Sequence, residues 1–158
     1  MKDHTPLSTF SVDRVRSFQL NKLTFDFLVN IGLPNECAPF LSFFEDSDEI
    51  YKGIFKLSDV YGFLKDIQEE NSNYSFDQYI IIGSDVSGNP IAINTKKDCI
   101  IEWLDHEDLF SAQFMNSSIQ QMGECIVVYK KFVESVILEN GESAILDSNF
   151  DDVHFDEL

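Results

Sequence analysis

The sequence predicts an α+β fold, in which helices pack against a central, mostly antiparallel sheet. Three apolar segments at about 79–83, 90–94 and 99–104 follow one another closely and are separated only by turn residues. Segments with apolar residues at helical spacing precede and follow them. Strands that succeed one another without an intervening helix are typical of α+β folds and not of βαβ repeats. A chain of 158 residues suits one domain with one core.

Three helices are expected before these strands. Ser11 is a candidate N-cap for the first, and the second is expected over about 24–31, where Gly32 is placed to end it. The third is expected over about 60–67, with Ser58 as its N-cap. The apolar residues expected on the buried faces of the second and third helices are Leu23, Phe27, Leu28, Ile31, Val60, Phe63, Leu64 and Ile67.

Two further strands and a long helix complete the expected elements. Residues 39–44 and 53–57 have the apolar composition of short strands. Apolar residues recur at steps of three and four over about 118–137, which predicts a helix with one apolar face. Ser117 and Gln120 have the spacing of a capping box at its start.

The expected domain organisation has three parts. Residues 1–10 are expected to form a flexible N-terminus, and residues 11–138 the α+β domain. Residues 139–158 contain seven acidic and no basic residues, yet also several large apolar ones. We therefore expect this acidic C-terminal segment to dock on the domain.

The charge balance restricts the class of partner. The chain has 28 acidic and 11 basic residues, a formal net charge of −17. Nucleic acid and anionic membranes would be repelled, whereas a basic protein would be attracted over long range. The alternative is that the charge only maintains solubility. No apolar run is long enough to span a bilayer, and no secretory signal is recognised, so we expect a cytoplasmic location.

No pattern for catalysis or for a cofactor stands out. Cys37, Cys99 and Cys125 are widely spaced and are expected to act as packing residues. Asp105–Asp108 and Asp151–Asp156 are the only candidate metal clusters, and neither has the spacing of a metal-binding motif. Nucleophile-elbow and phosphate-loop motifs are absent from the sequence. We expect no cofactor, no metal and no enzymatic activity, although an enzyme with an unmarked site stays an alternative.

Four segments resemble the SUKH superfamily. They are the hairpin Ile80–Asn94, the segment Trp103–Asp108, the helix start Phe114–Ser118 and the helix end Phe27–Pro34. The resemblance covers about residues 24–137. It implies a compact α+β domain with a central, largely antiparallel sheet. Bacterial members of this superfamily are largely immunity proteins, which neutralise toxin domains by binding them.

The resemblance and the charge together predict a non-catalytic immunity protein. Its partner would be a cognate toxin domain, most commonly a nuclease with a basic active-site cleft that the protein blocks. The protein itself is expected to be a monomer or a weak homodimer. The alternative is a regulatory or scaffolding module of the same superfamily. The candidate partner-binding residues are Asp105, Glu107, Asp108, Asp147, Asp151, Asp152, Asp156 and Glu157, with Glu45, Asp46, Asp48 and Glu49 as a second group.

Overall fold

The computed structural model describes residues 6–37, 41–141 and 143–144. The helices are α1 (Val12–Arg16), α2 (Lys22–Asn30), α3 (Leu57–Val60), α4 (Phe63–Glu70) and α5 (Ile119–Asn140). The strands are β1 (Leu7–Ser8), β2 (Leu33–Pro34), β3 (Glu36–Cys37), β4 (Leu41–Phe43), β5 (Phe55–Lys56), β6 (Tyr79–Asp85), β7 (Pro90–Asn94), β8 (Ile100–Asp105) and β9 (Ser111–Asn116). The chain divides into two compact units, residues 1–123 and 124–158.

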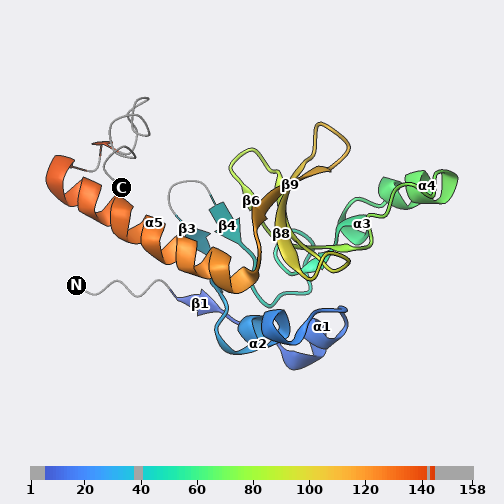
Figure 1. Ribbon diagram of the computed structural model, residues 1–158, viewed down its shortest axis with the longest axis horizontal. Coiled ribbons are helices and arrows are strands. Elements are labelled where there is room, and N and C mark those ends of the chain that lie inside the picture. The colour runs from blue at the N-terminus through green and yellow to red at the C-terminus, as the bar shows by residue number, and fades with distance from the viewer. Residues whose placement is uncertain (1–5, 38–40, 142, 145–158) are drawn as a thin grey trace. The chain divides into compact units, whose positions relative to one another are not determined.

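The first unit is built on a seven-stranded sheet (Figure 1). Its strand order is β3-β4-β6-β7-β8-β9, and β5 also pairs with β6. Every strand pair that the structure describes is antiparallel. This sheet with its helices is the α+β fold that the sequence predicts.

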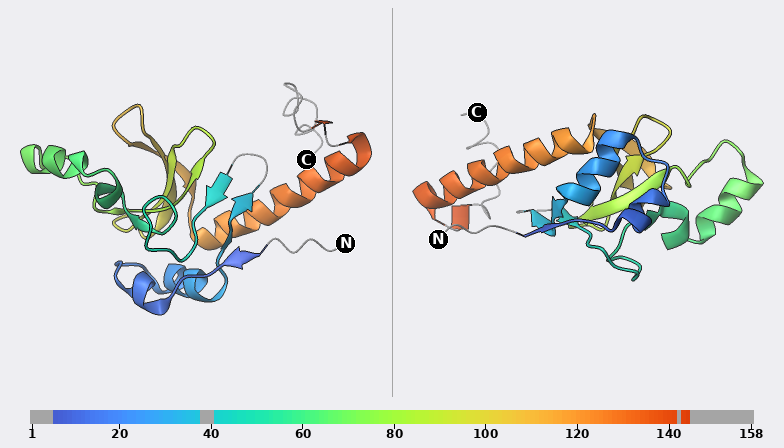
Figure 2. Two further views of the ribbon diagram at one scale, coloured as in Figure 1. Left: turned by 180° about the vertical axis from the view of Figure 1, so that it is seen from behind. Right: turned by 90° about the horizontal axis from the view of Figure 1, so that it is seen from below.

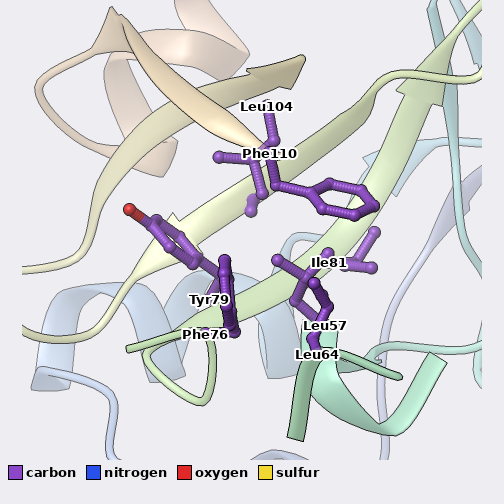
Figure 3. Close-up of a cluster of buried hydrophobic side chains, with 8 residues drawn as sticks. Leu57, Leu64, Phe76, Tyr79, Ile81, Leu104 and Phe110 are labelled. Carbon is purple, nitrogen blue, oxygen red and sulfur yellow. The ribbon is translucent and has the colours of Figure 1, made fainter. Parts of the chain in front are cut away.

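One face of the sheet packs on α3 and α4. Leu57 of α3 and Leu64 of α4 are fully buried against Ile81 and Leu104 of the sheet (Figure 3). Phe110, which follows β8 in the chain, belongs to the same buried cluster. Burying side chains of this size stabilises the fold by about 2 kcal/mol each. The cluster therefore ties the end of the β8–β9 hairpin to α3 and α4.

The opposite face of the sheet carries a row of isoleucines. Ile80, Ile93 and Ile101 are directly opposite one another on three neighbouring strands, and each is at most 1% exposed. The helices α1 and α2 lie across this face (Figure 2). Because both faces are covered, β6 and β7 consist of nearly continuous apolar residues, as their sequences predict.

The helix α2 runs from Lys22 to Asn30 and so begins two residues before the expected range of about 24–31. Asn21 caps its start, because the side-chain oxygen accepts a hydrogen bond from Thr24 N at 2.9 Å. Gly32 ends it with a φ of +79°, and a β-carbon at this position would lie 2.2 Å from the carbonyl oxygen of Ser8. The predicted termination by Gly32 is therefore confirmed.

The single helix expected over 60–67 is instead two helices. The chain leaves the helical conformation at Tyr61, which has a φ of −111° and a ψ of 78°, and restarts at Phe63. Ser58 is not an N-cap but lies inside α3, where its hydroxyl donates to Asp77. Leu23, Ile31 and Phe63 are exposed, although the sequence places them on buried helix faces.

Two other expectations are only partly met, and one strand is unexpected. The helix α5 starts one residue later than expected, because Ser118 Oγ accepts from Gln121 N at 3.1 Å. Cys37 and Cys99 are buried as predicted, but Cys125 is exposed. The strand β9 is not anticipated by the sequence. Along the described residues, no helix combines the length and apolar character that crossing a bilayer requires.

Candidate functional site

Three of the candidate carboxylates lie together in the turn that joins β8 to β9. Within this turn, Asp105 O accepts hydrogen bonds from Asp108 N at 3.2 Å and Phe110 N at 2.7 Å. Its carboxylate accepts from Glu107 N at 3.0 Å, which shapes the start of the turn. Glu107 and Asp108 are exposed, and no Lys or Arg among the described residues forms an ion pair with these three carboxylates. The turn is therefore a concentrated negative feature on the surface.

A hydrogen-bond network holds this turn against the neighbouring β6–β7 turn. Asp85 accepts from Trp103 Nε1 at 2.9 Å and from Asn89 Nδ2 at 3.0 Å. The side-chain oxygen of Asn89 in turn accepts from His106 N at 3.1 Å. Burial acts to raise the pKa of Asp85, but the hydrogen bonds from Asn89 and Trp103 outweigh it and lower that pKa below its usual value. The ionised Asp85 thus orients the acidic turn through Asn89.

Aromatic rings form a connected cluster beside this turn. The ring of Tyr61 lies 4.6 Å from that of Phe110, measured between centroids. It also lies 6.4 Å from the ring of Tyr51 and 6.5 Å from that of Phe63. Tyr51 is 61% exposed and Phe63 is 53% exposed. Burial, with a smaller effect of Tyr51, raises the pKa of Tyr61, so its hydroxyl is neutral at pH 7.

The cluster and the acidic turn are connected through Phe110, which is buried. Phe110 N donates to Asp105 O, and the Phe110 ring contacts Tyr61. Phe110 and the partly buried Tyr61 therefore link the turn to the exposed rings of Tyr51 and Phe63. We call this the acidic–aromatic surface, which comprises Tyr51, Tyr61, Phe63, Asp105, Glu107 and Asp108.

The second acidic group, in the loop 45–52, is half neutralised, since its four carboxylates lie with two cations. Arg14 Nε lies 2.5 Å from Asp46 Oδ1, and Arg14 Nη2 lies 2.5 Å from Asp48 Oδ1. Lys52 Nζ pairs with Glu49 Oε2 at 2.7 Å. Burial acts to lower the pKa of Arg14, but the two aspartates raise it overall, so these ion pairs persist across the neutral range. We therefore leave this group out of the acidic–aromatic surface.

The remaining candidate residues lie outside the described residues. They are Asp147, Asp151, Asp152, Asp156 and Glu157. The docking expected of residues 139–158 accordingly stays a prediction. Residues 1–10 are expected to be flexible, but Leu7 and Ser8 form β1, which pairs with β2, and Phe10 is 3% exposed; for residues 1–5 the expectation stays a prediction.

The sequence did not identify the aromatic part of the surface. Tyr51, Tyr61 and Phe63 are distant from Phe110 in the chain, so no local pattern links them. One signal was available: Tyr51 stands in a polar turn next to Lys52 and Gly53, where a large apolar side chain has no helix or strand face to bury it.

The structure also contains an open cavity of about 520 Å³ between α1 and the segment 54–59. Arg14, Asp48, Lys56 and Asp59 are among its lining residues. Arg14 and Asp48 are paired with each other, and Asp59 is paired with Lys65, so most of its charges already have partners. Within the part of the chain that the structure covers, no three His, Cys, Asp or Glu side chains are grouped as a metal site would require.

Comparison of the chain with protein-family models, with curated proteins and with solved structures finds no significant match.

Proposed function

We propose that this chain is a non-catalytic binding protein that receives a basic domain of another protein on its acidic–aromatic surface. The observation that carries the proposal is the contact between Phe110 and Tyr61, which joins exposed rings to a turn of three carboxylates without a basic partner among the described residues. The resemblance to the SUKH superfamily supports the same class of function.

The composition of the surface suits a protein–protein interface. Tyrosine and other aromatic residues are enriched among the residues that carry most of the binding energy of interfaces, typically near the centre. Tyr51 and Phe63 are exposed on either side of Tyr61, which provides an apolar centre. Glu107 and Asp108 are exposed beside it and attract a cationic partner. The rings supply affinity, and the carboxylates supply the association rate and the choice of partner.

The partner that we propose is a toxin domain, most commonly a nuclease. A nuclease needs a basic cleft to hold the phosphates of its substrate. Carboxylates in a fixed turn imitate the charge of those phosphates, so a protein with a net charge of −17 can occupy such a cleft. The protein would act as an immunity protein by obstruction, and no bond would be made or broken.

Co-expression with the product of the gene immediately upstream tests the proposal. We expect that product to be toxic alone, and the chain to restore growth and to inhibit the purified toxin at equimolar ratio. An upstream product that is harmless, or one that the chain binds but does not inhibit, would contradict the proposed immunity role.

Paired variants then test the surface itself. In the double variant Tyr51→Ser, Phe63→Ser we expect an affinity loss of about 10- to 100-fold, because interface aromatics contribute about 1–3 kcal/mol when truncated. Both side chains are exposed, so the fold should persist. The control is Val86→Ser, an exposed apolar residue in the β6–β7 turn.

In the double variant Glu107→Gln, Asp108→Asn we expect a decrease of about three- to tenfold, mainly in the association rate, that disappears at about 0.5 M salt. The control for charge is Glu69→Gln, Glu70→Gln at the end of α4. Equal effects of test and control variants would remove the acidic–aromatic surface from the proposal.

A further inference from the structure

The strand β9 is an edge of the sheet. It pairs with β8 along one side, and no described strand pairs with its other side. The side chains of its first four residues are all exposed, and Phe114 is 66% exposed. A strand in this position presents a row of main-chain donors and acceptors to the solvent.

This edge lacks most of the devices that prevent pairing with another chain. Proteins protect edge strands with lysines and other charged residues, with prolines, or with bulges. The six residues of β9 include no charged residue and no proline. The only irregularity is the register shift opposite Ile101 and Glu102, near the end of the strand. Residues 111–114 therefore form a regular, uncharged template.

The register of β9 determines the pattern of a strand that would pair with it. Phe114 is opposite Glu102 and Ala112 is opposite Leu104, so these two side chains lie on one face of the sheet. Gln113 is opposite Trp103 on the other face. An added strand would place alternate side chains next to Phe114 and Ala112 on one face and next to Gln113 and Ser111 on the other. Apolar and polar residues in alternation fit this edge.

The surrounding charge selects a basic occupant. Ser111 is opposite Asp105, so the acidic turn stands directly at the start of β9. A second copy of this chain would bring another net charge of −17 against the first, which opposes self-pairing. A segment that alternates apolar residues with lysine or arginine satisfies both the register and the charge.

We propose that β9 accepts an extended basic segment of the partner as an additional antiparallel strand of the sheet. This inference rests on the proposed function and specifies how part of the partner binds. Strand addition gives affinity through main-chain hydrogen bonds and specificity through alternate side chains. The partner would thus contact β9 and the adjacent acidic–aromatic surface together.

A synthetic peptide tests the inference without the natural partner. The probe is a capped peptide of three lysine–valine repeats, which matches the six residues of β9. Amide hydrogen exchange of the isotope-labelled full-length chain is followed by nuclear magnetic resonance. We expect exchange at alternate amides within 112–115 to slow about tenfold at saturation, since these amides gain hydrogen-bond partners, whereas Ser111 N already donates to Asp108 O.

Two controls separate strand addition from simple charge attraction. The same peptide methylated at every backbone nitrogen keeps its charge but has no main-chain donors. We expect it to bind about 10- to 100-fold more weakly, because each lost hydrogen bond is worth about 1 kcal/mol. On the protein side, Phe114→Ser should weaken the unmodified peptide about threefold or more, whereas Val86→Ser should not.

Several results would overturn the inference. The methylated and unmodified peptides could bind with equal affinity, the amides that exchange more slowly could all lie outside β9, or the peptide could fail to bind. Concentration-dependent protection of β9 without peptide would show that a second copy is the occupant. None of these results affects the toxin test, because inhibition by the acidic–aromatic surface does not require strand addition. A failure of the toxin test likewise leaves the peptide measurement interpretable.

Discussion

The substitution Asp85→Asn tests whether one ionised side chain holds the two turns together. The carboxylate of Asp85 accepts four hydrogen bonds: from Ser87 N at 2.9 Å, Asn89 N at 2.8 Å, Asn89 Nδ2 at 3.0 Å and Trp103 Nε1 at 2.9 Å. An asparagine retains one side-chain oxygen, which can still serve the two main-chain donors. Its amide nitrogen would then face the Asn89 and Trp103 donors, and neither hydrogen bond could form.

The expected cost follows from these two lost bonds. A hydrogen bond to a charged group contributes about 1.5 kcal/mol or more, so the variant should lose about 3 kcal/mol of unfolding free energy. For a chain of this length, that corresponds to a decrease in Tm of about 6–12 °C. Asn89 cannot compensate by rotating its amide, because its oxygen accepts from His106 N.

The assay is denaturant unfolding followed by tryptophan fluorescence, since Trp103 is the only tryptophan of the chain. The lowered pKa of Asp85 means that its stabilisation is complete above its usual pKa and is lost as the pH falls through the folded-state value. The difference between wild type and variant should therefore be largest near pH 7 and should decrease below about pH 4.

The control for this assay is Glu69→Gln, an exposed carboxylate on α4. A loss below about 1 kcal/mol, or a difference that does not change with pH, would refute the assignment of Asp85 as the charged centre of the network.

Two further substitutions test the sheet. Gly83→Ala should destabilise the fold by about 3 kcal/mol in thermal unfolding, because its β-carbon would lie 2.3 Å from the carbonyl oxygen of Ser42, whereas Gly62→Ala, with open space at its β-carbon, should change little. Lys97→Met should lower the free energy of unfolding by about 2 kcal/mol, because it leaves the carboxylate of Glu102, which is 3% exposed, without its cation. The expected loss is smaller than for a fully buried ion pair, because the side chain of Lys97 is 58% exposed. Glu102 raises the pKa of Lys97, so in the wild type this stabilisation should be present up to about pH 10.5 and be lost as the pH rises through the raised pKa. A variant with the same free energy of unfolding as the wild type at neutral pH would contradict this.

The central strands were predictable because their local sequence is consistent with their environment. Tyr79–Asp85 and Pro90–Asn94 are apolar on both faces, and the turn between them is fixed by Asp85 and Asn89. The strand Ser111–Asn116 was not predictable, because its first four side chains are all exposed and show no alternation. Pairing with β8, and not burial, keeps this segment extended.

The carboxylates of the acidic–aromatic surface were predictable from the sequence, whereas its aromatic rings were not. Asp105, Glu107 and Asp108 are neighbours in sequence, so their charge is visible without a structure. The ring contacts of Tyr61 with Tyr51 and Phe110 span up to 49 positions of the chain and depend on the fold. The pairing of Arg14 with Asp46 depends on it in the same way and partly neutralises an apparent acidic cluster.

The two sides of the aromatic cluster consequently carry unequal charge. Four carboxylates of the loop 45–52 meet two cations, Arg14 and Lys52, whereas the turn 105–108 has three carboxylates without an ion pair among the described residues. A partner with lysines on one flank of an apolar patch would be aligned by this asymmetry before contact. Rotation of that partner by half a turn would place its lysines over the partly neutralised loop, so the difference in charge favours one docking direction.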